Sequence, residues 1–154
     1  MATGRSVSRE LGGWGGRAVG NRWLLKTEPG EYSFDDLIRD KKTVWDGVTN
    51  ALALKHLRSI QKGDELLIYH TGSVRAAVGL ARAASDSYPD PAMQSPLIVV
   101  VDVVPIRRLA QPVTLQAIKA VPAFRPSELV RLPRLSVMPV PNALWRRILQ
   151  MSEA

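Results

Sequence analysis

The sequence predicts an α+β fold in which short strands form a small, partly closed barrel with short helices around it. The chain has 154 residues, the size of one domain, and 45% of them are apolar, enough for a hydrophobic core. Segments typical of strands alternate with short helical patterns, and there is no internal repeat. Because the connections are mostly short, we expect hairpins to join most of the strands.

Five apolar segments are expected to be strands. Each is short, rich in branched or aromatic residues, and bounded by residues that favour turns. Gly79 lies inside one of them and indicates a β-bulge or a close approach of another backbone segment. The segment richest in β-branched residues is LIVVVDVVPI. The five segments span residues 22–27, 65–70, 76–83, 97–106 and 134–140.

Two helices in the first half are expected to begin at capping residues. Ser33 can accept a hydrogen bond from the backbone three residues later, and Asp36 can bond back to it. That helix should be short and end near Asp40. Asn50 can cap the next helix. Its leucines should face inward, namely Leu52, Leu54 and Leu57.

Two further helices are expected near the C-terminus. Thr114 begins the first of them, TLQAIKA, and a proline-rich connection follows at 122–126. Pro141 suits the first turn of the last helix, which should reach Gln150. The spacing of apolar residues predicts three buried side chains on this helix, those of Leu144, Trp145 and Ile148.

Composition places the domain boundaries close to the two ends of the chain. Residues 1–21 contain GGWGG and are expected to form a flexible, basic, glycine-rich tail. They lack the continuous apolar core of a secretion signal. We therefore expect the folded domain at 22–150 and a short C-terminal tail at 151–154.

The charge of the chain favours partners that carry phosphate. Its formal net charge is +7 and its isoelectric point is near 10.2. Four arginines and one glutamate in residues 1–22 supply +3 of this charge, which leaves +4 for the rest. The domain is therefore mildly basic, which permits nucleic-acid binding without establishing it.

Several classes of function lack their sequence features. There is no cysteine, which excludes disulfides, thiolate metal ligands and a cysteine nucleophile. Two histidines are too few for a conventional zinc site. The nucleophile elbow, the P-loop and the dinucleotide-binding glycine motif are all missing. We therefore expect a protein that is not an enzyme, has no cofactor or metal, and has no membrane span.

Trp45 is the residue whose role the sequence leaves open. Trp23 and Trp145 lie in periodic apolar patterns and are assigned to the core. Trp45 instead lies between a lysine pair and an Asp-Gly turn. It can pack in the core, or it can form a wall on which a nucleobase stacks, a contact worth about 1–3 kcal/mol. Composition does not separate these two roles.

Other polar residues stand at the ends of apolar segments. Lys26 and His70 each end a strand, where they can be structural or can lie at the rim of a pocket. Ser33 and Asn50 can each cap a helix and line a pocket at the same time, because a helix N-terminus presents unpaired backbone N–H groups.

Several motifs occur together in an order that resembles the EVE domain family. The resemblance covers residues 22–150 and depends on the combination, since each motif alone is weak. It implies a PUA-like fold, a bent β pseudo-barrel surrounded by short helices. The motifs are WLLKTEPGEYSFDDL (23–37), VWDGVTNALALKHLRSIQKGDELLIYHTG (44–72), AVGLARA (77–83), SYPDP (87–91), VDVVPIRRLAQPVTLQAIKA (101–120), and RLSVMPV (134–140) before a helix that contains Trp145.

The resemblance implies a non-catalytic module that reads a modified base in DNA or RNA, with modified cytosine as the leading candidate. Trp45 would form a flat apolar wall for a base taken out of its stack, and Asn50 and Ser33 would read its polar edge. Lys26 would favour a carbonyl or a phosphate. Thr49 takes the place of an arginine that many members have. The implied site residues are Lys26, Ser33, Trp45, Val48, Asn50, His70, Leu135 and Ser136.

Two other functions stay open on the sequence. One is an enzyme that acts on a modified nucleotide with His70 or a carboxylate as acid or base. The other is an RNA-binding or interaction module that uses outer basic residues such as Arg107 and Arg108 without pocket specificity. For the leading hypothesis we expect a cytoplasmic monomer whose partner is modified nucleic acid and not a membrane.

Overall fold

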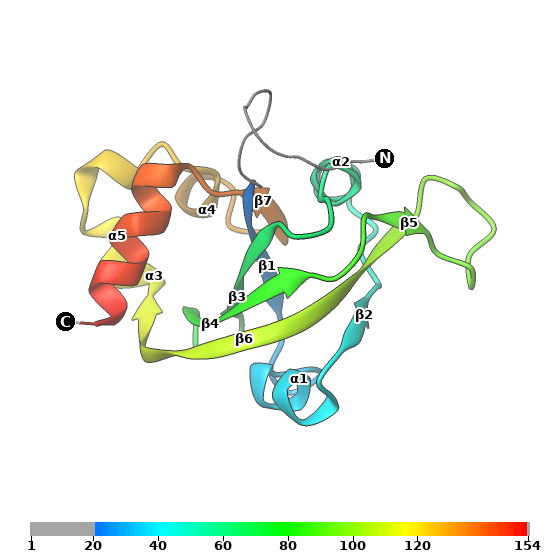
Figure 1. The fold of residues 1–154 in the computed structure, drawn as a ribbon. Helices are drawn as coiled ribbons and strands as arrows, with labels where there is room; N and C mark the ends of the chain where they lie inside the picture. Colours follow the sequence, from blue (N-terminus) through cyan, green and yellow to red (C-terminus); the bar gives the residue numbers. More distant parts are fainter. Residues whose placement is uncertain (1–20, 154) are drawn as a thin grey trace, which may run out of the picture.

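The computed structural model describes residues 21–153 and has an α+β fold built on one curled sheet (Figure 1). Its strands run in the order β2-β6-β4-β3-β1-β7, with β5 paired to β6. The sheet forms a half-barrel with short helices around it, which confirms the predicted α+β, PUA-like fold. The strands are β1 (Arg22–Thr27), β2 (Thr43–Trp45), β3 (Glu65–His70), β4 (Ala76–Ala83), β5 (Tyr88–Pro89), β6 (Val99–Thr114) and β7 (Val137–Pro139).

Most of the helices form one group beside this sheet. This group gathers at the left of Figure 1 and comes from the C-terminal part of the chain. It comprises α3 (Leu115–Lys119), the 3-10 helix η2 (Pro122–Phe124), α4 (Glu128–Arg131) and α5 (Asn142–Ser152). The other two helices lie apart, with α1 (Phe34–Asp40) at the bottom of the view and α2 (Ala51–Arg58) at the top.

Among the described strands, only β3–β4 and β5–β6 are consecutive antiparallel neighbours, so the expectation that hairpins join most strands is wrong. The pairing of β1 with β3 is parallel. In this pair Lys26 lies opposite Tyr69 and Thr27 lies opposite His70. Parallel neighbours need a crossover connection, and here the crossover contains α1, β2 and α2. The pair formed by β3 and β4 is a direct antiparallel hairpin. The parallel pair brings the C-terminal ends of β1 and β3 to the same edge of the sheet.

Strand β6 is longer than the sequence predicted. It continues from Val99 to Thr114, beyond the expected end at residue 106, and crosses the whole molecule in Figure 1. Its antiparallel pairing with β4 shifts register twice, and such irregularities increase the local twist and bend a strand. The curvature of β6 therefore allows one strand to pair with β5 and β2 near one end and with the start of β4 near the other.

Gly79 lies at a bulge, as predicted, and the close approach there is made by a side chain and not by the expected backbone segment. The pairing of β4 with β6 shifts register between Ala77 and Gly79. A Cβ atom added at Gly79 would lie 2.5 Å from Cζ of Phe34, the first residue of α1. The missing side chain therefore lets the Phe34 ring pack directly on the sheet and holds α1 against it.

The predicted caps of α1 and α2 are confirmed. Ser33 Oγ accepts a hydrogen bond from the Asp36 backbone N–H at 3.0 Å, and Asp36 Oδ2 accepts one from Ser33 N–H at 2.9 Å. Asn50 Oδ1 accepts the Ala53 backbone N–H at 3.0 Å. On α2, Leu54 and Leu57 are buried as expected, whereas the inward orientation of Leu52 was a wrong prediction because that side chain is 36% exposed.

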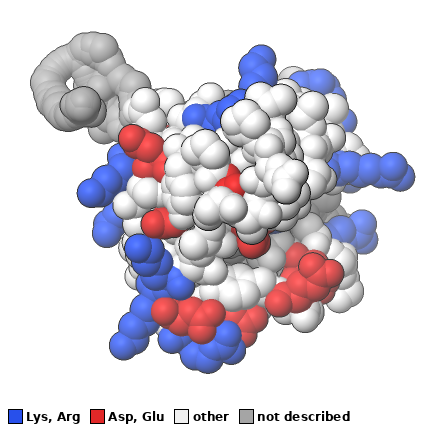
Figure 2. Space-filling view, turned by 90° about the vertical axis from the view of Figure 1, so that its right-hand side faces the viewer, with Lys and Arg blue, Asp and Glu red and all other residues white. Residues whose placement is uncertain are grey.

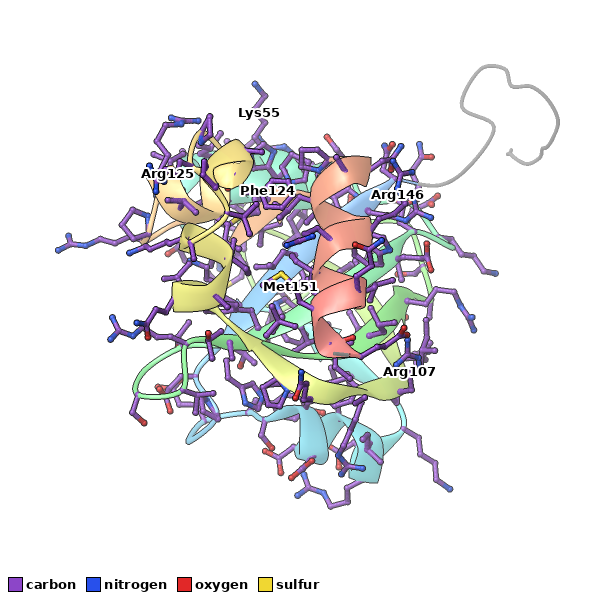
Figure 3. All side chains as sticks on the ribbon, turned by 90° about the vertical axis from the view of Figure 1, so that its left-hand side faces the viewer. Lys55, Arg107, Phe124, Arg125, Arg146 and Met151 are labelled. Atoms are coloured by element: carbon purple, nitrogen blue, oxygen red, sulfur yellow. The ribbon has the colours of Figure 1, made fainter. Side chains whose placement is uncertain are left out.

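The C-terminal part combines confirmed and unexpected elements. Thr114 caps α3 as predicted, while α4 was not foreseen and β7 is shorter than the expected 134–140 segment. Helix α5 ends at Ser152, two residues later than expected, and buries Leu144, Trp145 and Ile148 as its pattern indicated. Figure 3 shows Met151 of α5 between this helix and α3, while Arg146 projects away from the core.

The core contains Trp23 and Trp145, as predicted. The buried carboxylate of Asp64 fixes the start of β1 through hydrogen bonds from Trp23 and Asn21. Asp64 is fully buried, and its Oδ2 accepts a hydrogen bond from Trp23 Nε1 at 2.9 Å.

The expected flexible tail lies almost entirely outside the described residues. Within 21–153, no helix has the length and apolar character needed to cross a membrane.

Candidate functional site

A cleft of about 470 Å³ opens where β1 ends, and it contains most of the polar residues singled out from the sequence. The end of β1 and the following turn form one side, and β2 with the segment leading to α2 forms the other. Its volume is in the range typical of small-molecule sites. Its lining residues are Lys26, Thr27, Glu28, Glu31, Tyr32, Thr43, Val44, Trp45, Asp46, Gly47, Val48, Thr49, Asn50 and Ser136.

Trp45 belongs to the core and to the wall of the cleft at once. It is 8% exposed and lies opposite Val101 of β6 in the sheet. Its ring meets that of Tyr32 edge-on, with centroids 6.5 Å apart and planes at 87°. An edge-to-face pair of this kind fixes the orientation of both rings. Trp45 therefore packs in the core and also lines the cleft, while stacking of a nucleobase on it stays a prediction; Tyr32 adds a second aromatic side chain to the lining.

The turn that carries Tyr32 is held by several hydrogen bonds. The Tyr32 backbone N–H donates to the Glu28 carbonyl at 2.9 Å, and Thr27 Oγ1 donates to the Tyr32 carbonyl at 2.7 Å. The Tyr32 hydroxyl donates to Asp40 Oδ2 at 3.0 Å. Burial raises the pKa of Tyr32, and the bond to Asp40 raises it further, while a bond with Thr43 opposes the shift. The Tyr32 side chain is therefore uncharged and held in one orientation in the lining of the cleft.

Asn50 presents a hydrogen-bond donor to the cleft. Its amide oxygen accepts the Ala53 N–H, and this contact assigns the oxygen because a backbone N–H cannot bond to the amide nitrogen. The amide nitrogen has no hydrogen-bond partner among residues 21–153, and the side chain lines the cleft. Capping the helix therefore leaves both N–H groups of Asn50 available to a ligand.

Lys26 is positioned on the opposite side of the cleft. Its backbone N–H donates to the Ser136 carbonyl at 2.9 Å, and its Nζ donates to the Pro133 carbonyl at 3.0 Å. Nζ also lies 5.3 Å from the centroid of the Tyr69 ring, a cation–π geometry. Burial lowers the pKa of Lys26. These contacts anchor the ammonium group and join β1 to the segment that precedes β7.

Carboxylates outnumber cations in the cleft. Glu28, Glu31 and Asp46 line it together with the single cation Lys26. Figure 2 shows the side of the molecule that carries β2 and α1, where acidic and basic side chains are mixed near the bottom and many basic ones lie along the edges. A cleft with this balance suits a ligand edge that donates hydrogen bonds better than it suits a phosphate.

Five of the eight residues implied by the sequence line this cleft, and three do not. The five are Lys26, Trp45, Val48, Asn50 and Ser136. Leu135 is buried and lines a separate, mostly apolar pocket beside it, which shares Asn50 with the cleft. Ser33 caps α1 and is absent from the lining, as is His70. Whether any of the eight binds a ligand stays a prediction.

His70 has a structural partner. Its Nε2 accepts the backbone N–H of Phe34 at 3.0 Å, so this nitrogen carries no proton and the ring is neutral. Burial lowers the pKa of His70, and the carboxylates of Asp35 and Glu28 oppose the shift. The geometry therefore gives His70 the role of fixing the start of α1 to the end of β3.

The sequence reasoning did not select the acidic residues of the cleft or Tyr32. Tyr32 directly precedes the cap residue Ser33, and Asp46 belongs to the same VWDGVTN segment as Trp45, so both were adjacent to residues already chosen. Glu28 and Glu31 belong to the turn after β1 and had no distinguishing pattern. Among the described residues, no three His, Cys, Asp or Glu side chains are grouped to hold a metal ion.

The curled sheet and its cleft define a small PUA-like domain with a polar, aromatic-walled cavity at one sheet edge. Residues 21–151 match the EVE domain, which is most of the chain. The protein belongs to the EVE domain family.

Proteins similar to this chain occur in bacteria and in animals. Rpa0253 from Rhodopseudomonas palustris, solved by NMR, is 34% identical, covers 86% of this chain and 93% of its own, and superposes with a TM-score of 0.82. Human THYN1, crystallised in complex with DNA that contains 5-methylcytosine, is 25% identical over 87% of this chain and 98% of its own, with a TM-score of 0.79.

Curated relatives match over a shorter stretch. Thymocyte nuclear protein 1 of Rattus norvegicus is 34% identical over 87 residues, which is 49% of this chain and 38% of that protein. The match thus spans less than half the length of the curated relative.

Proposed function

We propose that this protein is a non-catalytic module that binds nucleic acid and reads a modified nucleobase, with modified cytosine as the leading candidate. The observation that carries the proposal is the pairing, in one cleft, of the Trp45 wall with the unpartnered amide N–H groups of Asn50. The similar human protein was crystallised with DNA containing 5-methylcytosine, which supports this choice of ligand.

The polar groups of the cleft complement the edge of a cytosine taken out of its stack. Cytosine carries an amino group that donates and ring atoms that accept. The Asn50 amide can donate to an acceptor, and the carboxylates of Glu28, Glu31 and Asp46 offer acceptors for the amino group. Enzymes and readers that bind an extruded base combine such edge contacts with stacking on apolar walls. The same cleft therefore favours a cytosine-like edge over a phosphate.

Burial of the methyl group of a modified base adds little binding free energy, so the shape of the cleft must also contribute to discrimination. Burial of one methylene-sized group contributes about 0.8 kcal/mol, which corresponds to about fourfold in affinity. Val48 and Trp45 supply apolar lining for such a group. We therefore expect the affinity for 5-methylcytosine to exceed that for cytosine by about fourfold or more.

The decisive experiment measures binding by fluorescence anisotropy at several stated salt concentrations, since phosphate contacts make affinity depend on salt. The probes are matched DNA and RNA oligonucleotides, single-stranded and duplex, with cytosine or 5-methylcytosine at one position. Tighter binding of the methylated probe is expected. Equal affinity for every matched pair, unaffected by Trp45→Phe, would contradict the proposal.

Trp145→Phe is the matched control for Trp45→Phe. Both tryptophans are buried, but Trp145 lies on α5 and does not line the cleft. The two variants should lose comparable stability, and Trp45→Phe alone should reduce the preference for the methylated probe. Loss of the preference in both variants would show that general destabilisation is responsible.

A further inference from the structure

A second, basic pocket lies between the turn after β3 and the start of α3. Its volume is about 370 Å³, and its polar lining comprises Ser73, Arg75, Thr114, Gln116 and Lys119. No carboxylate belongs to this lining, in contrast to the cleft at the end of β1. The two pockets therefore have opposite electrostatic character.

The backbone fixes the two cations of this pocket relative to each other. Ala76 pairs with Thr114, and the Leu115 backbone N–H donates to the Arg75 carbonyl at 2.9 Å. This bond ties the residue that carries the guanidinium to the first residue of α3. Lys119 follows Leu115 by four positions, about one helical turn, so it lies on the same side of α3.

Arg75 occupies an uncommon backbone conformation. Its φ is 47°, in the left-handed region that residues other than glycine seldom adopt. Residues held in this way often cluster at ligand-binding sites, because the surrounding structure must stabilise them. Here the hydrogen bond from Leu115 and the start of β4 hold the turn.

Both cations are available to a ligand. Arg75 and Lys119 are exposed, and neither forms an ion pair with any residue in 21–153. Their neighbours in the pocket add the hydroxyl groups of Ser73 and Thr114 and the amide of Gln116. Two cations with hydroxyl and amide donors form the usual surroundings of a phosphate.

The basic pocket and the cleft belong to the same edge of the sheet. β1 and β3 are parallel and end together at Thr27 and His70, and Thr71 N–H donates to the Thr27 carbonyl at 3.0 Å. Lys26 Nζ of the cleft lies 5.3 Å from the centroid of the Tyr69 ring. Burial raises the pKa of Tyr69, and the positive charge of Arg75 opposes that shift. Lys26 of the cleft and Arg75 of the second pocket therefore both lie near Tyr69.

We propose that the pocket formed by Ser73, Arg75 and Lys119 binds a backbone phosphate of the nucleic acid whose modified base occupies the cleft. This inference rests on the proposed function. The base and the phosphate would bind at different sites, because the carboxylates of the cleft repel a phosphate and the cations of the basic pocket attract one. The pocket contributes affinity that does not depend on the base.

The first test compares the salt dependence of oligonucleotide binding in the full chain and in the double variant Arg75→Gln/Lys119→Gln. Loss of one phosphate contact on duplex DNA should reduce the slope of log K against log salt by about 0.9. Between about 50 and 200 mM salt, the wild-type affinity should therefore fall about threefold to fourfold more than that of the variant. The ratio between methylated and unmethylated probes should not change.

Arg82→Gln, which removes one of the two positive charges that the double variant loses, is the control. Arg82 is exposed and lies near the other end of β4, so its loss changes the net charge without affecting the pocket. A slope in the double variant equal to that of Arg82→Gln would overturn the inference. The proposed function would still stand if the preference for the methylated probe persisted, so the two failures can be distinguished.

A second test uses wild-type protein and removes charge from the probe. Neutral methylphosphonate linkages are placed one at a time on both sides of the 5-methylcytosine. One linkage should weaken wild-type binding, and the double variant should lose nothing further at that linkage, because interacting partners are not additive. Equal losses in both proteins at every linkage would refute the contact.

Inorganic phosphate distinguishes a backbone phosphate from a free phosphate ion. Titration with phosphate should shift the NMR signals of Arg75 and Lys119 weakly, and added phosphate should compete with the oligonucleotide at this pocket. The inference would be overturned if phosphate alone bound tightly and the double substitution left the affinity for the oligonucleotide unchanged. That result would identify a site for a free anion.

Discussion

The backbone N–H of Phe34 donates a hydrogen bond to Nε2 of His70 at 3.0 Å. Phe34 is the first residue of α1, and His70 is the last residue of β3. A helix begins with backbone N–H groups that have no partner within the helix, so the imidazole satisfies one of them. The contact fixes α1 to the sheet beside the turn that lines the cleft.

The first prediction concerns pH. The pKa of His70 in the folded protein lies below its usual value of 6.5, mainly because of burial. As pH falls below 6.5, the unfolded chain therefore binds a proton before the folded protein does. The contribution of His70 to the free energy of unfolding is fully present above pH 6.5. It is lost as pH falls through the lower pKa that His70 has in the folded protein. Urea unfolding at about pH 7.5 and about pH 5.5 measures the change.

His70→Gln is the control for that measurement. A glutamine oxygen can still accept the Phe34 N–H but does not titrate. This variant should lose less stability than the wild type between the two pH values, and His56 is present in both proteins. An identical decline in both would show that His70 does not cause the loss. His70→Ala should be less stable at both values by about 0.5–1.5 kcal/mol because it removes the acceptor.

The second prediction concerns the contact between Gly79 and Phe34. Gly79→Ala places a Cβ 2.5 Å from the Phe34 ring, so the ring and α1 must move. Overpacking of this kind costs about 1–3 kcal/mol of stability, which chemical denaturation would measure. The double variant Gly79→Ala/Phe34→Leu should be less destabilised than the sum of the two single variants. Additive losses would contradict the direct contact.

The third prediction separates the two roles of Asn50. Asn50→Asp keeps an oxygen that accepts the Ala53 N–H but removes the amide donor. Its stability should be close to that of the wild type, whereas binding of 5-methylcytosine oligonucleotides should weaken by about 1–3 kcal/mol. Asn50→Ala should also lose about 0.5–2 kcal/mol of stability, since it removes the cap. Unchanged binding by Asn50→Asp would exclude Asn50 as the reader of the base edge.

The fourth prediction concerns the buried carboxylate of Asp64. Its two oxygens accept hydrogen bonds from Trp23 Nε1 and from the backbone N–H groups of Gln61 and Asn21. Asp64→Asn replaces one acceptor by an NH₂ group, so a buried donor loses its partner at a cost of about 1–3 kcal/mol. Asp86→Asn is the control because Asp86 is exposed and can reorient. Equal thermal stability of both variants would contradict the prediction.

The fold class and most elements could be predicted because their causes are local. The capping box of Ser33 and Asp36 joins residues three positions apart, and the Asn50 cap spans the same distance. The apolar periodicity of α5 likewise lies within one segment and gave its buried face. Trp45, Val48 and Asn50 share one short segment, and the family resemblance had implied all three as site residues, so that part of the cleft lining was also expected.

The sequence by itself indicated most of the helices and the longer strands, most of the core residues on them, and the family that the motifs resemble, but not β2, β5, η2 or α4. Only the tertiary structure decided that β1 and β3 are parallel, that His70 holds Phe34 across 36 positions, and that the cleft collects carboxylates. It also placed Arg75 and Lys119 in the lining of one pocket. These relationships depend on packing between distant segments, and one sequence carries no periodicity or spacing that records such contacts.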